Sequence, residues 1–541
     1  MTTDERGSPE VLLIGVDACC NRVIEPLFEE GRLPNLRSIF ETGASDTLTS
    51  QIPPWTASAW PSLYTGVNPG KHGVFDFLTY DGYDWGVVNA STVREHALWE
   101  LLDQNGLSSV VVNVPVTHPP GEFDGAIIPG FTAPENPDCH PDAILAEVRD
   151  AIGEYRVYPT PGGDEEVFPE YLECVRMRGE AFRYLLDRYY PDFGFLQFQA
   201  TDTIFHQYSH EDEELIAAVY EAVDEQIGET LEVVDPGLVL LVSDHGLGPY
   251  RGYEFRVNDF LADHGYVETQ RGGSGMPSWT LIRDERLRKG DDDTTREMSP
   301  LERGVAMASK VGITTSHVRR ALEVVGLDEF AIEHAPPGVV SVSDRQVDFP
   351  NSKAYMRSRV ETGVRINLEG RDPEGVVPQS EYEKVREELI DLLSGVETPD
   401  GEPLFEDVIR VEEHFEGPYV GDAVDVLTVP NDWEHFLSAQ LRGEHFGPPA
   451  EPWNHKLDGV VAAVGPAIDD GASLEGAHIH DVAPTVLAAF GVPVSDRMDG
   501  RVLPIVEPAG ETSYPEYGGP DSSATMDEDV EGRLATLGYL E

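Results

Sequence analysis

The chain has 541 residues, of which 38 are Lys or Arg and 99 are Asp or Glu, so its formal net charge is −61. A field this negative repels nucleic acids and anionic membranes, so we expect neither as a partner. The length allows one large domain with insertions, and a hydrophobic content of 40% permits a sizeable core.

The acidic residues are spread along the whole chain rather than gathered in a tail, and lysine is rare. An acidic interaction protein is one interpretation of this pattern. Dispersed acid with Arg favoured over Lys fits better with a surface adapted to molar salt, where screening acts over about 3 Å. We therefore expect the chain to come from a halophilic archaeon.

The cysteines and the N-terminus indicate a soluble, cytoplasmic protein. Cys19, Cys20, Cys139 and Cys174 form no C-x-x-C pair, which favours reduced thiols over a zinc ribbon or a disulfide framework. The first ten residues, MTTDERGSPE, lack the basic and apolar regions of a signal peptide. No apolar run approaches the length of about 18 residues that a membrane span needs.

Short apolar runs alternate with helical patterns along the chain. The runs, which read as buried parallel strands, are 11–16, 108–114, 193–199, 237–243 and 458–465. The helical patterns cover 22–42, 94–105, 171–189, 211–232, 380–395 and 481–490. This alternation predicts an α/β fold with a doubly wound, mostly parallel sheet and helices on both faces.

Four segments define the expected domain organisation. We predict a catalytic domain over 8–505, interrupted by a cap or lid at 118–170 and a helical insertion at 268–335. Both insertions are rich in turn-forming or charged residues. Residues 506–541 have the composition of a linker followed by a short acidic helix.

Several side chains suited to metal binding stand at predicted strand ends. Asp17 closes the first strand, and Asp244 and His245 close the strand over 237–243. The carboxyl ends of strands are where open α/β sheets bind ligands. An Asp-His pair at the end of a buried strand needs compensation for its desolvation, which a metal can provide.

Three further residues complete the candidate ligand set. Asp202 and His206 are four positions apart, so they share one face of a helix start. His455 precedes the last predicted strand, where a surface histidine is the ordinary interpretation. Mixed Asp and His ligands suit zinc, or less often manganese.

Thr56 lies in a segment dense in Pro, Gly and Trp, PPWTASAWPSLYTGVNPGKHGVFDF, at 53–77. Because Pro61 is best tolerated in a first turn, we expect a helix to start near Ser58. Thr56 would then stand before a helix N-terminus and face an anion together with exposed N–H groups. The alternative is an ordinary N-cap threonine.

The order of these motifs resembles the alkaline phosphatase superfamily, in particular its type I phosphodiesterase/nucleotide pyrophosphatase-like branch. The resemblance covers about residues 10–505. It is carried by Asp17, by Thr56 ten residues before Gly66, and by NPGKHG (68–73), SDHG (243–246) and a late His before a DG-strand. VNDFLADHGYV (257–267), RINLEGRDPEGVV (365–377) and DVAPTVLAAFGVP (481–493) match the same branch, whereas Pro61 stands where relatives often carry Thr.

The resemblance implies a phosphohydrolase that acts through a phospho-threonine intermediate on Thr56. Asp202, His206 and His455 would hold one divalent metal, and Asp17, Asp244 and His245 the other, with Thr56 next to the second. Helix N–H groups, with Asn113 or Lys71, would bind the oxygens of a small phosphorylated substrate. The remaining interpretations are a phosphomutase, a sulfatase, for which the required C/S-x-P-S-R segment is missing, and a non-catalytic interaction module without metal.

Overall fold

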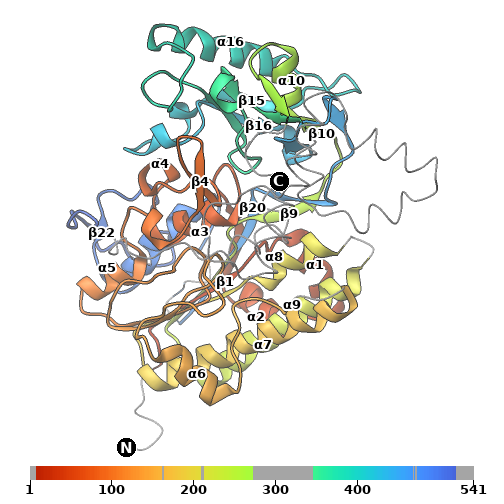
Figure 1. Cartoon of the computed structure of the whole chain (residues 1–541). Coiled ribbons are helices and arrows are strands. Elements are labelled where there is room, and N and C mark those ends of the chain that lie inside the picture. The colour runs from red at the N-terminus through yellow and green to blue at the C-terminus, as the bar shows by residue number, and fades with distance from the viewer. Residues whose placement is uncertain are drawn as a thin grey trace, which may run out of the picture.

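The computed structural model describes residues 8–160, 164–208, 212–271, 345–466, 468 and 472–518. Its centre is an eight-stranded sheet (Figure 1). In sheet order the strands are β21 (Ala477–His478), β2 (Ala44–Thr49), β20 (Asp458–Val464), β8 (Leu238–Val242), β1 (Val11–Val16), β7 (Phe193–Phe198), β5 (Ser109–Val112) and β6 (Gly125–Ile128).

All five predicted strands lie in this sheet. β1 pairs in parallel with both β7 and β8, and every residue of these strands is buried, as their continuous apolar sequences indicate. β20 runs antiparallel to both of its neighbours. All other neighbouring strands of the sheet are paired in parallel, so the sheet is mostly parallel. β2, β6 and β21 escape prediction because each is short or partly exposed and lacks a clear apolar run.

Helices cover both faces of the sheet. The α-helices of the described residues, including those of a second core, are α1 (Asn21–Glu30), α2 (Pro34–Thr42), α3 (Thr56–Thr65), α4 (Pro69–His72), α5 (Leu98–Gln104), α6 (Ile144–Ile152), α7 (Asp164–Tyr189), α8 (Ala200–Gln207), α9 (Glu213–Val233), α10 (Val257–Asp263), α16 (Tyr382–Ser394) and α17 (Val482–Ala489). α7 packs on β5 and β7 and against α9. Figure 1 shows α6, α7 and α9 on one side of the sheet and α3 and α5 on the other, and α17 packs against α3 and α5.

The single helix predicted over 22–42 is wrong, because the structure has two helices there. Gly31 ends α1 with a left-handed backbone (φ 73°), which a residue with a Cβ rarely adopts. Pro34 then opens α2, where its missing N–H costs nothing. The apolar periodicity continues across the break, which is why the pattern alone merges the two helices.

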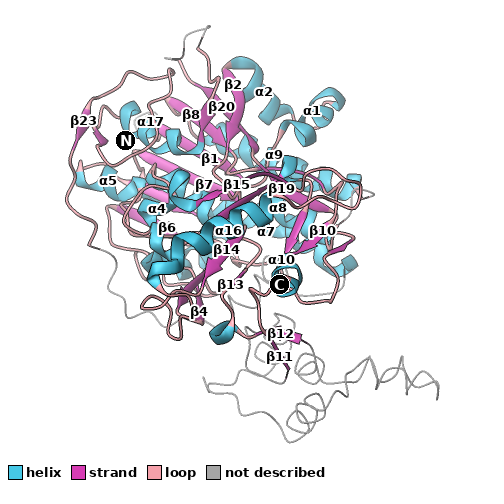
Figure 2. Cartoon of the chain, turned by 90° about the horizontal axis from the view of Figure 1, so that it is seen from above, coloured by secondary structure: helices cyan, strands magenta, loops and turns pink. Residues whose placement is uncertain are grey.

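A second hydrophobic core lies above the main sheet in Figure 1 and includes Phe255, Leu261, Tyr355, Leu389 and Val426. Its strands are β13 (Ala354–Tyr355), β14 (Gly363–Ile366), β16 (Val426–Pro430) and β15 (Phe405–Arg410) in one sheet, and β17 (Phe436–Ser438), β10 (Glu254–Arg256) and β18 (Phe446–Gly447) in another. α10 and α16 belong to this second core (Figure 2).

Four two-stranded ribbons complete the described strands. They are β3 (Leu78–Asp81) with β4 (Asp84–Val87), β9 (Gly246–Pro249) with β19 (Trp453–Lys456), β11 (Thr269–Arg271) with β12 (Arg345–Val347), and β22 (Val494–Ser495) with β23 (Glu511–Thr512). Among the described residues, no helix combines the length and apolar character needed to cross a lipid bilayer. Cys19, Cys20, Cys139 and Cys174 are buried free thiols.

The predicted insertions fall on different parts of the structure. Residues 118–170 include β6, an edge strand of the main sheet, and α6, which packs against α7. Almost all of the helical insertion predicted at 268–335 lies outside the described residues, as does the short acidic helix predicted at the end of 506–541. The cap at 118–170 and the domain boundaries stay predictions.

Candidate metal centre and active site

Asp17, Asp244 and His245 come together where two neighbouring strands end. β1 and β8 are paired in parallel, with Gly15 opposite Val242, so the residues that follow them emerge at the same edge. Nε2 of His245 lies 3.5 Å from Oδ1 of Asp17 and 3.4 Å from Oδ2 of Asp244. One ligand atom from each of the three residues falls within 4.8 Å of the others.

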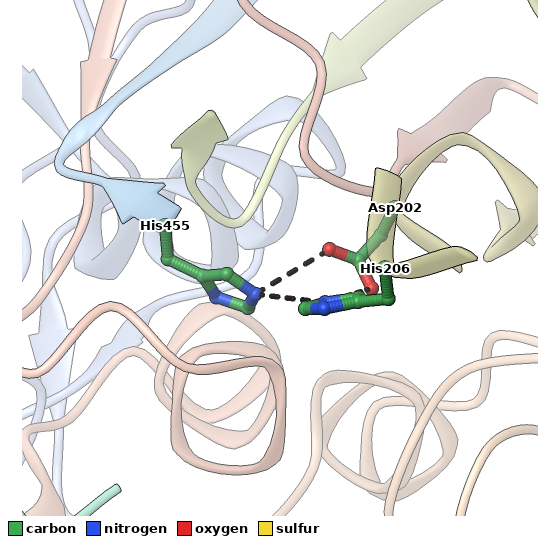
Figure 3. Close-up of side chains that lie close together, drawn as sticks. All are labelled: Asp202, His206 and His455. Atoms are coloured by element: carbon green, nitrogen blue, oxygen red, sulfur yellow. Dashed lines mark hydrogen bonds and ion pairs between the residues drawn. The ribbon is translucent and has the colours of Figure 1, made fainter. Parts of the chain in front are cut away.

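Asp202, His206 and His455 form a second group of the same kind, drawn in Figure 3. Asp202 and His206 share one face of α8, whereas His455 reaches the group from β19, which pairs with β9. Nε2 of His455 lies 3.3 Å from Nε2 of His206 and 3.5 Å from Oδ1 of Asp202. The distance from Nε2 of His206 to Oδ2 of Asp202 is also 3.5 Å.

The two groups adjoin each other, and Thr56 lies beside the first. The rings of His245 and His455 are stacked, with centroids 3.9 Å apart. Oγ1 of Thr56 is buried and lies 3.3 Å from Nε2 of His245. The structure therefore brings together Thr56 and all six predicted ligands, in the division that the sequence resemblance implies.

Helix α3 begins at Thr56, so the predicted start near Ser58 is wrong by two residues. Pro61 lies in the second turn, where α3 tolerates the loss of one backbone hydrogen bond. The N–H groups of Ser58 and Ala59 both bond to the carbonyl oxygen of Trp55. Within the described residues, the N–H groups of Thr56 and Ala57 donate no hydrogen bond, which leaves two donors at this helix end.

Hydrogen bonds fix the orientation of the candidate ligands. Nδ1 of His455 lies 2.9 Å from the carbonyl oxygen of Pro54, and Nδ1 of His245 lies 3.0 Å from that of Gly246. A carbonyl oxygen only accepts, so each Nδ1 carries the proton and each Nε2 keeps its lone pair toward the site. Asp17 is held through Oδ2, which accepts from Nε1 of Trp60 (2.9 Å) and Nε2 of Gln197 (2.8 Å).

The buried carboxylates repel one another. Burial raises the pKa of Asp17 well above its ordinary range, and the charges of Asp244 and Asp202 raise it further. Burial likewise raises the pKa of Asp244. Burial also acts to raise the pKa of Asp202, but His206, His455 and His245 together outweigh it and hold that pKa below its usual range. Such a cluster is costly in a protein interior unless a cation balances it.

The residues present fit divalent metal ions. Oδ1 of Asp17 and Oδ2 of Asp244 are buried and make no hydrogen bond with any described residue. Both atoms face Nε2 of His245, so two carboxylate oxygens and a nitrogen lone pair converge on one point. Three protein ligands of this kind, with a position left open, are typical of catalytic zinc sites.

The two residues predicted to bind substrate bond to protein groups in this structure, and their substrate role stays a prediction. Asn113 donates both N–H groups of its amide to Gln197, at 3.1 Å to the main-chain oxygen and 2.7 Å to Oε1, and thus supports Asp17 indirectly. Nζ of Lys71 donates to the carbonyl oxygen of Arg497 (2.9 Å) and pairs with Asp499. Within the described residues, neither side chain makes a hydrogen bond or ion pair with any of the six candidate ligands.

Two residues next to the site have no signal in the sequence. Oε2 of Glu451 lies 3.7 Å from Nδ1 of His206, and Oε1 of Glu451 lies 2.9 Å from Nη2 of Arg359. Both residues stand in segments without a recognisable motif. Because Glu451 approaches His206, and Arg359 approaches Glu451, from distant parts of the chain, only the folded structure reveals them.

The profile of one protein family, described as type I phosphodiesterase / nucleotide pyrophosphatase, matches residues 11–327. No curated protein sequence matches the chain significantly. Among solved structures, a phosphonoacetate hydrolase from Sinorhizobium meliloti 1021 in complex with phosphonoacetate is 14% identical, with 88% of this chain and 95% of that chain covered and a TM-score of 0.55.

The wild-type alkaline phosphatase PafA is also 14% identical, with 92% of this chain and 99% of that chain covered and a TM-score of 0.50. At this level of identity the two structures bear on the fold alone. They confirm the predicted alkaline phosphatase-like α/β architecture with a mostly parallel central sheet.

Proposed function

The chain belongs to the type I phosphodiesterase / nucleotide pyrophosphatase family, a family of phosphate-ester hydrolases, and we propose that it works through two divalent metals and Thr56 as nucleophile. One observation carries this proposal. Two groups of three ligand side chains adjoin each other, and the Thr56 hydroxyl lies 3.3 Å from a histidine of one group. All of these residues except His206 are buried.

Asp17, Asp244 and His245 would hold one ion, and Asp202, His206 and His455 the other. The mixture of carboxylate oxygens and imidazole nitrogens suits zinc, with manganese as the alternative. Two bound ions supply positive charge that stabilises the attacking and leaving oxygens of an in-line displacement. Asp17 and Asp244 would then remain ionised, because the metal charge offsets the burial that raises their pKa.

Thr56 would carry the phosphoryl group between two displacements. Its hydroxyl loses a proton to solvent, Oγ1 bonds to phosphorus, and the bond from phosphorus to the leaving oxygen breaks. A water molecule then attacks phosphorus, the bond to Oγ1 breaks, and Thr56 regains a proton. The free N–H groups of Thr56 and Ala57 at the start of α3 would donate to the phosphoryl oxygens throughout.

The substrate is a small phosphorylated molecule whose identity depends on residues outside the ligand groups. We test the reaction class with metal analysis combined with rates on bis-p-nitrophenyl phosphate, p-nitrophenyl phosphate and p-nitrophenyl sulfate in molar salt. We expect about two ions per chain and turnover of the phosphodiester above the sulfate ester. Dominant turnover of the sulfate ester would overturn the proposal in favour of a sulfatase.

We also propose a halophilic origin and a cytoplasmic location. A net charge of −61, spread over the whole chain, supports a halophilic origin and a cytoplasm rich in salt. The salt dependence of stability tests the halophilic origin independently of the proposed chemistry.

A further inference from the structure

Arg359 is a buried arginine from the segment between β13 and β14 of the second core. It is 2% exposed. Its guanidinium lies over the ring of Trp55, 5.3 Å from the centroid, and over that of Phe436, at 4.7 Å. A buried guanidinium needs a counter-charge, which Glu451 provides at 2.9 Å.

Glu451 connects Arg359 to one candidate ligand. While Oε1 pairs with Arg359, Oε2 lies 3.7 Å from Nδ1 of His206. Glu451 is therefore a carboxylate behind the histidine, in the place from which such groups orient metal-binding imidazoles.

Trp55 connects Arg359 to another ligand of the same group. The Trp55 ring packs on the ring of His455, with centroids 4.3 Å apart. Trp55 also precedes Thr56 and caps α3. The contacts of Arg359 with Glu451 and with Trp55 thus lead to histidines of the Asp202–His206–His455 group, the first by charge and the second by packing.

We propose that Arg359 and Glu451 are positioning residues for the metal held by Asp202, His206 and His455. This inference rests on the proposed two-metal function. Arg359 fixes Glu451 against His206 and Trp55 against His455, so the second core sets the affinity of one metal site. The site of Asp17, Asp244 and His245 receives its support from Trp60 and Gln197 instead and is independent of Arg359.

The test compares zinc retention in wild type, Arg359→Lys and Glu451→Gln after dialysis against graded concentrations of a chelator. Arg256→Lys is the matched control, because Arg256 is likewise buried in the second core and paired with a carboxylate, Glu254, at 3.0 Å. Zinc per chain is measured by mass spectrometry, and folding is checked by melting temperature.

Both variants should keep one ion as tightly as the wild type and bind the other about 10–100-fold more weakly. Excess zinc should restore activity, and Arg256→Lys should retain both ions. Glu451→Gln preserves side-chain volume, so its zinc retention decides the test if the melting temperature of Arg359→Lys is lowered. Unchanged affinity for both ions in Glu451→Gln would overturn this inference alone, whereas a wild type that holds fewer than two ions would overturn the proposed function.

Discussion

Thr56 Oγ1 lies 3.3 Å from Nε2 of His245, at the buried edge where β1 and β8 end. The proposed nucleophile therefore adjoins the Asp17 group, and the stacked rings of His245 and His455 join that group to the second one. The contact joins the start of α3, at Thr56, to the residues that follow β8.

Replacement of Thr56 should remove chemistry without removing metal. Thr56→Ala lacks the attacking oxygen, so we expect kcat to fall by about 10⁴-fold or more, as for other nucleophiles. Thr56→Ser keeps a hydroxyl and should retain part of the activity. Zinc per chain should equal that of the wild type in both variants. Full activity in Thr56→Ala would remove Thr56 from the mechanism.

Replacement of His245 should remove one metal and the activity together. His245→Ala deletes the nitrogen that completes the Asp17 group, while Asp202, His206 and His455 remain in place. We expect zinc per chain to fall from about two to about one, by mass spectrometry. His264→Ala, at an exposed histidine away from the site, is the control and should keep both ions. Two tightly held ions in His245→Ala would contradict the ligand assignment.

Removal of metal should destabilise the whole protein. Without cations, the carboxylates of Asp17, Asp202 and Asp244 stay buried close together. Bound metal at about 100 times its Kd adds about 2.7 kcal/mol per site to the free energy of unfolding. A chelator should therefore lower the melting temperature, and added zinc should restore it. An unchanged melting temperature with no activity lost would indicate that no metal binds.

Asp76 predicts a pH-dependent stability outside the metal site. Burial, with the charge of Glu361, raises its pKa from 3.8 to about 7. The fold thus favours the protonated carboxyl, whose contribution is present below pH 4 and is lost as the pH rises to about 7.

Asp76→Asn should therefore stabilise the protein above pH 7 by up to a few kcal/mol, and much less at pH 5. Melting temperatures at the two pH values measure this difference. Asp391→Asn, at an exposed carboxylate, is the control and should shift stability equally at both. A stabilisation by Asp76→Asn that is independent of pH would refute the assignment.

Salt should stabilise the chain strongly. At a net charge of −61, repulsion between surface carboxylates opposes folding, and screening shortens from about 10 Å at 0.1 M salt to about 3 Å at 1 M. We expect the melting temperature to rise steadily between 0.1 and about 2 M KCl. A melting temperature that stays constant or falls over this range of KCl would argue against a halophilic origin.

Strand ends were predictable from the sequence because buried parallel strands have a clear signature. Asp17 and Asp244 follow such strands, and neighbouring parallel strands bring their ends to one edge. The second core was not predicted, since β13, β14 and β17 are short. The break within 22–42 was also missed, because the spacing of apolar residues gives no sign that Gly31 adopts a left-handed backbone and ends α1.

Long-range partners lay beyond the sequence. Lys71, in the NPGKHG segment, pairs with Asp499, a residue 428 positions away that no local pattern identifies. The side-chain amide of Asn113 donates to Oε1 of Gln197, a residue that its local sequence does not identify as a partner. Glu451 meets His206, and Arg359 meets Glu451, only because folding brings distant segments together, which no local pattern encodes.

The stereochemical course at phosphorus tests the central claim most directly. A chiral phosphorothioate diester is hydrolysed in ¹⁸O-labelled water, and the configuration of the product is determined. Each in-line displacement inverts phosphorus, so transfer to Thr56 followed by transfer to water predicts net retention. Net inversion would show that water attacks the substrate directly and would contradict the covalent role of Thr56.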